Sequence, residues 1–165
     1  MKDPPEDPTV ERTLVLLKPD AVQRGLIGNI LSRFENKGLK IVGLKMRVFP
    51  KDHLRQHYDV HKARPFFNSL VEFMSSSPVV AIALEGNNAI AVARQLIGPT
   101  NSAEAPAGTI RGDLGMSFSH NLVHGSDAPE TAQSELALWF GDSAELASWT
   151  PCGENWVYDA EEELA

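Results

Sequence analysis

The chain has 165 residues, a length at which one compact domain can bury about 70% of its unfolded surface. Its composition, 42% hydrophobic and 22% charged, excludes a disordered or fibrous protein. No apolar run approaches the roughly 20 residues of a membrane-spanning helix, so we expect no membrane partner. The single Cys152 excludes an internal disulfide and a cysteine-based metal site. The acidic, proline-rich start does not resemble a secretory signal, so a cytoplasmic location is predicted.

The net charge of −7 is unevenly distributed along the chain. Every Lys and Arg lies at or before Arg111, whereas residues 112–165 contain only acidic charges. An anion held by cationic side chains must therefore bind to the first 111 residues. The acidic last third also opposes a long nucleic acid, so no strong nucleic-acid binding is expected.

The first half of the chain predicts a strand, a helix and a second strand. The apolar run at 13–17 ends at a Lys-Pro-Asp turn and predicts a buried strand. Apolar residues at helical spacing predict an amphipathic helix over 27–37, which Gly38 would end. Alternation over 39–49 predicts a long strand, and its change of parity at residues 42–43 predicts a β-bulge.

The middle of the chain is more helical. Short helices are expected around Leu54 and over 65–74, followed by a buried strand over 79–84. A regular apolar stripe then predicts a helix over 89–97, closed by Gly98.

The last part contains a long loop and one more strand and helix. Residues 99–120 show no sustained period, and a loop of that length in a compact domain tends to be functional or disordered. Residues 121–124 predict a short strand. Asp127 and Glu130 have the spacing of a capping box, and an apolar face from Ala132 to Phe140 predicts the helix that follows.

This alternation of strands and helices predicts one α+β or α/β sandwich domain. We assign it to residues 12–158, preceded by a flexible N-terminal arm at 1–11 and followed by an acidic tail at 159–165.

Searching for chemical motifs excludes the familiar phosphate-binding loops, because neither a Walker-type nor a Gly-x-Gly-x-x-Gly segment is present. The remaining candidate is His124, which ends an apolar run and precedes Gly125 and a helix start. A neutral imidazole has one nitrogen with a free lone pair, and a partner at the other nitrogen fixes its orientation. The alternative is a half-buried strand histidine without a chemical role.

Seven segments decide between these interpretations, because they stand in the order found in nucleoside diphosphate kinases. They are Lys18-Pro19-Asp20, Gln23-Arg24-Gly25, His57-Tyr58, Arg64-Pro65-Phe66-Phe67, Gly108-Thr109-Ile110-Arg111-Gly112-Asp113, Asn121-Leu122-Val123-His124-Gly125-Ser126-Asp127 and Trp156-Val157-Tyr158. The chain thus resembles this family over about residues 11–158.

The resemblance implies a ferredoxin-like βαββαβ sandwich with a four-stranded antiparallel sheet. It implies transfer of the γ-phosphate of a nucleoside triphosphate to a nucleoside diphosphate, by a ping-pong mechanism through a phosphohistidine. Mg2+ would be bound through the nucleotide phosphates, without a metal site on the protein. It also implies a homo-oligomer, with a hexamer favoured by the C-terminal Trp-Val-Tyr segment and a tetramer possible.

The resemblance also implies roles for individual residues. His124 would carry the phosphate, and Glu135 and Ser126 would orient it. The phosphates and sugar would be surrounded by Lys18, Tyr58, Arg94, Thr100, Arg111 and Asn121. The base would be clamped by Phe66, Leu70 and Phe118.

Independent residue chemistry agrees in part. Phosphoryl transfer needs preplaced cations, which Lys18, Arg94 and Arg111 can supply. Phe66 is expected to be exposed and its neighbour Phe67 to lie inside. Phe118 is larger than the small aliphatic residue expected from relatives, and His120 replaces a more usual Arg or small polar residue.

Three alternatives stay open. One is a catalytically silent nucleotide-binding or regulatory scaffold of the same fold, and another is a nucleic-acid-binding regulator. The third is a metal site on His53, His57 and His61, which a continuous helix would align.

Overall fold

The computed structural model describes residues 10–141 and 144–159. Within them, four strands form one antiparallel sheet in the order β2-β3-β1-β4. The strands are β1 (Val10–Leu17), β2 (Lys40–Arg47), β3 (Val79–Asn87) and β4 (Val123–Gly125). This order, with helices between the strands, is the predicted ferredoxin-like sandwich.

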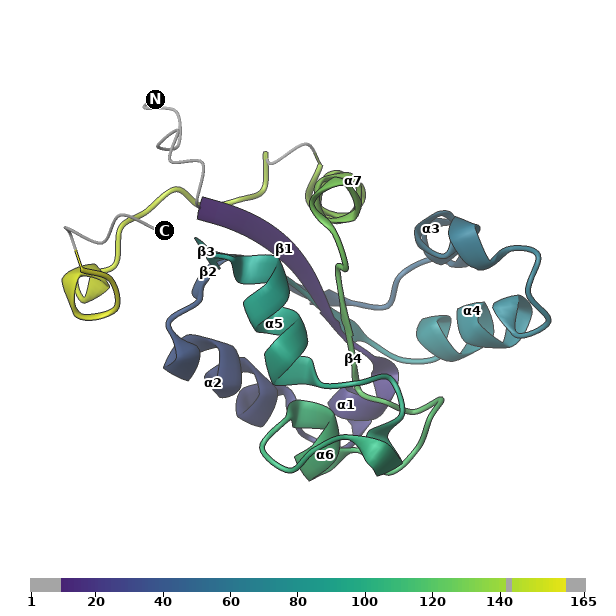
Figure 1. The fold of residues 1–165 in the computed structure, drawn as a ribbon. Coiled ribbons are helices and arrows are strands. Elements are labelled where there is room, and N and C mark those ends of the chain that lie inside the picture. Colours follow the sequence, from purple (N-terminus) through teal and green to yellow (C-terminus); the bar gives the residue numbers. More distant parts are fainter. Residues whose placement is uncertain (1–9, 142–143, 160–165) are drawn as a thin grey trace.

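Helices cover both faces of the sheet (Figure 1). The α-helices are α1 (Pro19–Gln23), α2 (Ile27–Lys37), α3 (Lys51–His57), α4 (Phe67–Ser75), α5 (Ala89–Ile97), α6 (Ile110–Leu114) and α7 (Pro129–Phe140). Short 3-10 turns cover Asp59–His61, Ser102–Glu104 and Glu154–Trp156. Helices α2 and α5 lie on one face, α7 lies on the other, and α3 and α4 project to one side of the sheet.

The two central strands are buried from both sides, which explains why their sequences are continuous apolar runs. Val15 and Leu17 belong to the core beneath α2 and α5. Leu14 and Leu16 belong to the second core, which contains Trp139 of α7.

Several local predictions are confirmed. The register of β2 against β3 shifts between Ile41 and Gly43, at the predicted bulge. Helix α2 ends at Gly38, whose φ of 102° is accessible to glycine at little cost. Helix α5 covers the predicted residues 89–97.

Other expectations are corrected. Val10 and Glu11, assigned to the flexible arm, begin β1 because they pair with Asn87 and Gly86 of β3. Residues 1–9 and 160–165, which hold the rest of the arm and nearly all of the tail, lie outside the described residues. The strand predicted over 39–49 ends at Arg47.

The long segment 99–120 contains two helical turns that periodicity missed, because each is too short to show a repeat. Side-chain caps start both: Asn101 accepts a hydrogen bond from the Ala103 N–H, and Thr109 accepts one from the Gly112 N–H. The predicted capping box of Asp127 and Glu130 is wrong. Helix α7 begins at Pro129, with Ala128 at the N-cap and no side-chain cap bond.

The C-terminal segment lies along the outer edge of β2 near the bulge. The Ala147 N–H donates to the Val42 carbonyl at 2.6 Å, and the Trp149 indole N–H donates to the Ile41 carbonyl at 3.1 Å. Farther along β2, Leu44 and Met46 remain 54% and 53% exposed. In the described ranges, no helix is long and apolar enough to cross a membrane.

Candidate active site

His124 lies in the short edge strand β4, where its side chain is 24% exposed. Its Nε2 is 2.9 Å from Glu135 Oε1, and Glu135 accepts a 2.5 Å hydrogen bond from the Ser126 hydroxyl at its other oxygen. Because the carboxylate accepts, the His124 proton lies on Nε2, and the lone pair of Nδ1 is left for chemistry. This pairing also explains why a carboxylate is buried on α7.

An unusual backbone turn places His124. Leu122 has a φ of +70°, and the Val123 N–H donates back to the Asn121 carbonyl at 2.8 Å. The Leu122 N–H is bound by Asp20 Oδ2, and its carbonyl accepts the Lys18 N–H. These bonds hold a conformation that is costly for a non-glycine residue, and they delay the start of β4 from the predicted 121 to Val123.

His57, at the end of α3, packs edge-on against the His124 ring, with ring centroids 4.7 Å apart. The Trp139 indole N–H donates to His57 Nδ1 at 3.1 Å. Burial, followed by charge repulsion from His124, lowers the pKa of His57 well below its usual value. His57 is therefore a neutral ring with its proton on Nε2, and it buttresses His124.

Lys18 and Asn121 form a buried polar pair beside this histidine. Lys18 Nζ donates to Asn121 Oδ1 at 2.7 Å, and Asn121 Nδ2 donates to the Thr100 carbonyl at 3.1 Å. Burial, with repulsion from Arg111, lowers the pKa of Lys18 to about 8. Lys18 is thus a cation at neutral pH that loses its charge in mildly alkaline solution.

Arg111 is almost fully buried and donates to three main-chain carbonyls: Gly98 at 2.9 Å, Asn121 at 3.1 Å and Val123 at 2.6 Å. Burial, with repulsion from Arg94, lowers the pKa of Arg111 to about 10, which leaves it charged at neutral pH. The guanidinium therefore adds positive charge beside β4 and ties the end of α5 to the turn before His124.

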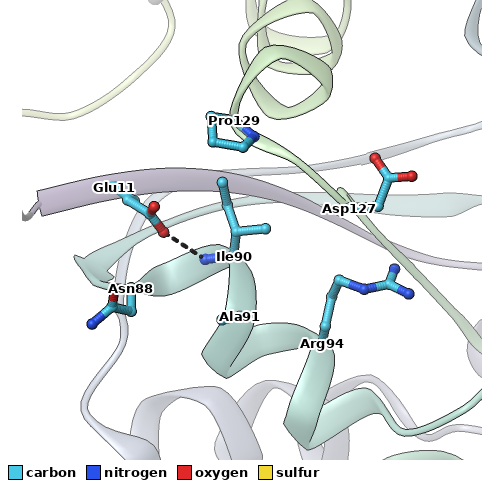
Figure 2. A pocket seen from close by; sticks show the side chains of 7 residues that line it. All are labelled: Glu11, Asn88, Ile90, Ala91, Arg94, Asp127 and Pro129. Carbon is cyan, nitrogen blue, oxygen red and sulfur yellow. Dashed lines mark hydrogen bonds between the residues drawn. The ribbon is translucent and has the colours of Figure 1, made fainter.

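Arg94 is exposed on α5, where its Nη1 reaches the Gly125 carbonyl at 3.4 Å. It also lines a pocket of about 420 Å³ between α5 and the start of α7 (Figure 2). Glu11 and Asp127 line the same pocket. A pocket lined by two carboxylates and a single guanidinium does not suit a polyphosphate, so we place the candidate site at His124 instead.

Tyr58 is buried between histidines, with its ring 4.5 Å from His57 and 6.5 Å from His124 between centroids. Burial raises the pKa of its phenol, which therefore stays protonated. Its hydroxyl is buried and has no hydrogen-bond partner among the described residues.

The predicted base-binding side chains lie on two elements. Phe66, 49% exposed as expected, precedes α4, and Leu70 is half-buried on the same helix. Phe67 packs against the core, as predicted. Phe118 is 64% exposed in the segment after α6.

The alternative histidine metal site is not formed. Helix α3 ends at His57, so the three histidines do not share a continuous helix. His53 packs against Phe49 and Trp139, whereas His61 packs against Tyr58 and Phe66.

His57, His124 and Glu135 do bring potential metal-ligating atoms within 4.8 Å of one another. However, His57 Nδ1 already accepts from Trp139, and the Glu135 oxygens accept from His124 and Ser126. In this hydrogen-bonded cluster, His57 Nδ1 and both Glu135 oxygens are therefore already engaged, whereas His124 Nδ1 keeps its lone pair.

Sequence reasoning did not assign Asp20 or Trp139 to the site. It named His57 in a segment of the family resemblance and as a possible metal ligand, but gave it no role beside His124. Asp20 stands in the Lys18-Pro19-Asp20 segment, so a signal was present, but its bond to residue 122 spans 102 positions. Trp139 looked like an ordinary core residue of an apolar helix face.

Comparisons with known proteins agree with this arrangement. The family model described as nucleoside diphosphate kinase matches residues 11–144. The chain therefore belongs to the nucleoside diphosphate kinase family, which consists of phosphotransferase enzymes.

Its relatives match nearly their whole length. The nucleoside diphosphate kinase of Crocosphaera subtropica is 56% identical over 150 residues, which cover 91% of this chain and 100% of the relative. The structure of the Halobacterium salinarum nucleoside diphosphate kinase, in complex with CDP, superposes with a TM-score of 0.87 at 47% identity. That match covers 90% of this chain and 99% of the other. A nucleoside diphosphate kinase family protein from Babesia bovis gives 0.86 at 47% identity, with the same coverage.

Proposed function

We propose that this enzyme transfers the γ-phosphate of a nucleoside triphosphate to a nucleoside diphosphate, through a phosphohistidine at His124. The observation that carries the proposal is the Glu135–His124 hydrogen bond at Nε2, which leaves Nδ1 as the nucleophile. In the first step the Nδ1 lone pair bonds to the γ-phosphorus, the bond to the bridging oxygen breaks, and a nucleoside diphosphate leaves. In the second, a β-phosphate oxygen of another diphosphate takes the phosphoryl group, and the N–P bond breaks.

Positive charge around His124 supports this chemistry. Lys18, Arg94 and Arg111 come from three different elements and would neutralise the transferring phosphoryl group. The buried Tyr58 hydroxyl, which lacks a hydrogen-bond partner among the described residues, would donate to a phosphate oxygen, whereas Thr100 and Asn121 would position the sugar and the polyphosphate.

Base binding would rest on apolar contacts. Phe66, Leu70 and Phe118 offer ring faces and aliphatic surface, which accept any base because they do not read its edge. A broad nucleoside specificity follows.

Mg2+ completes the proposed substrate. The residues that contact His124 fit a metal held by the nucleotide and not by the protein, because both Glu135 oxygens already accept hydrogen bonds from His124 and Ser126. Bound to the phosphates, Mg2+ would offset the negative charge of the transferred group.

Nucleoside triphosphates and Mg2+ are abundant in the cytoplasm, where we propose that the enzyme works.

Incubation with ATP and Mg2+, followed by intact-mass measurement in alkaline solution, tests the proposal. We expect a gain of one phosphate that acid removes, present in the control variant His53→Gln and absent in His124→Ala. Phosphorus–nitrogen correlation by NMR should assign the phosphate to Nδ1. A phosphate retained in His124→Ala would refute the mechanism.

The second candidate, a silent scaffold of the same fold, would bind nucleotides without gaining mass. The paired lysine, the charged arginine and the oriented histidine favour the enzyme. No mass gain despite measurable nucleotide binding would establish the scaffold instead.

We further propose that the chain forms a homo-oligomer, a hexamer in preference to a tetramer. The half-exposed Leu44 and Met46 on the outer strand β2, with Val48 just after it, support an interface with a second copy. Sedimentation at micromolar concentration tests this: a tetramer would correct the stoichiometry, and a monomer would overturn the proposal.

A further inference from the structure

One ring contact joins the two elements that carry the proposed base-binding side chains. Phe73 of α4 stacks on His120, with ring centroids 4.8 Å apart and planes inclined by 22°. His120 belongs to residues 115–121, which follow α6, and it lies 47 positions from Phe73 in the sequence.

The His120 side of this contact is firmly held. The Ser117 hydroxyl accepts hydrogen bonds from the N–H groups of Ser119 and His120, both at 3.2 Å. The next residue, Asn121, is buried and bound to Lys18. His120 therefore lies between the turn held by Ser117 and Asn121, which is hydrogen-bonded to Lys18.

On the α4 side, Val71 and Met74 pack into the second core, and Leu70 and Phe73 lie partly buried against it. Helices α3 and α4 form an insertion between β2 and β3 and project to one side of the sandwich (Figure 1). Phe66, Leu70 and Phe73 stand at helical spacing on one side of α4, since the Leu70 N–H already donates to the Phe66 carbonyl at 2.9 Å. A restraint on Phe73 therefore also restrains the two side chains nearer the helix start.

We propose that the Phe73–His120 stack is a brace that sets the separation between the α4 side chains and Phe118, and so the width of the base slot. This inference rests on the proposed function, in which Phe66, Leu70 and Phe118 contact the base. Phe73 and His120 are positioning residues, because they act through α4 and the segment after α6.

The size of the effect follows from the strength of an aromatic pair. Such pairs contribute enough to change an equilibrium roughly two- to tenfold. The base is contacted equally before and during phosphoryl transfer, so loosening the slot weakens uniform binding. We therefore expect KM for the nucleoside diphosphate to rise about two- to tenfold, with kcat little changed.

The test uses the full-length enzyme and two pairs of variants. His120→Ala and Phe73→Leu remove the stack, whereas His120→Phe and Phe73→Tyr keep two rings and serve as matched controls. For each variant, kcat and KM are measured with a purine and with a pyrimidine diphosphate. The dissociation constant of the diphosphate is measured by calorimetry.

We expect both ring-removing variants to raise KM and the dissociation constant for both bases, and the ring-keeping variants to restore them. In the double variant, KM and the dissociation constant should rise no more than in the more affected single variant, since each substitution removes the same contact. A fall in kcat with KM unchanged, or additive losses in the double variant, would overturn the brace.

The assay separates this inference from the proposed function. If the wild-type enzyme binds diphosphates and transfers phosphate but the ring-removing variants match it, only the brace is refuted. If the wild type neither binds diphosphates nor transfers phosphate, the proposed function fails and the brace fails with it.

Discussion

At the scale of single residues, one carboxylate organises the chemistry. Glu135 reaches both His124 and Ser126 from α7, so it fixes the imidazole tautomer and faces the charge that develops when the ring is phosphorylated. The two donors therefore account for a carboxylate that is buried on α7.

Replacing this carboxylate should slow histidine phosphorylation without abolishing it. Glu135→Gln keeps an oxygen acceptor but removes the charge, and hydrogen bonds to charged groups contribute about 1.5–3 kcal/mol. The rate should therefore fall about 10- to 100-fold. Quenched single-turnover phosphorylation with ATP measures it, and Ser126→Ala, which leaves the Glu135 charge in place, should lose less. An unchanged rate for Glu135→Gln would exclude the charge from the mechanism.

The lowered pKa of Lys18 predicts that the activity depends on pH. Its pKa is lowered to about 8, so the cation is present below that pH and is lost as pH rises through it. Since the cation would bind phosphate, kcat/KM for the nucleoside triphosphate should decline above about pH 8.

Activity measured from pH 6 to 10 checks this expectation. Lys18→Arg is the matched control, because its guanidinium stays charged throughout the range. Its residual activity should lack the decline near pH 8. The same decline in Lys18→Arg would assign the titration to another group.

At the scale of secondary-structure elements, the turn before β4 is the least ordinary part of the fold. Leu122 is fully buried and has a positive φ, and it is secured by Asp20 and Lys18 from the first β–α connection. Backbone strain at this residue is thus balanced by contacts from a distant part of the chain.

A comparison of two substitutions tests this strain. Leu122→Ala and Leu122→Gly both remove the buried side chain, but only glycine adopts a positive φ freely. Leu122→Gly should therefore be more stable than Leu122→Ala by about 1 kcal/mol, the reverse of the usual order. Urea unfolding measures the difference, and the usual order would show that the turn relaxes.

The same turn shows where sequence-based prediction ends. The bulge in β2 and helix α5 could be predicted because their hydrophobic periods are local. The late start of β4 depends on Asp20, and the tautomer of His57 depends on the Trp139 indole N–H, 82 positions away. No local pattern contains such contacts.

The candidate site divides in a similar way. His124 and Glu135 could be chosen from a motif and from a carboxylate beside an apolar helix face. The three hydrogen bonds that Arg111 donates to main-chain carbonyls could not be predicted. The acceptors belong to segments that meet only in the folded chain. Sequence indicated its charge but not its structural role.

At the scale of the whole molecule, the outer strand β2 is where another copy would join. Leu44→Lys and Met46→Lys place charge on this surface and should weaken the assembly, because burying an unpaired ammonium is costly. Sedimentation should show dissociation at micromolar concentration. Val60→Lys, at an exposed site outside β2, is the control and should leave the assembly intact. If all three variants sediment alike, the interface does not lie on β2.

The C-terminal segment lies along that same strand, so its loss has a cost unrelated to catalysis. A chain ending before residue 147 would leave the main-chain groups of β2 near the bulge without the cover that Ala147 and Trp149 provide. Open strand edges recruit further strands, and growth of this kind has no natural stopping point. Prematurely terminated copies should therefore accumulate as insoluble deposits, even though every phosphate-handling side chain is still encoded.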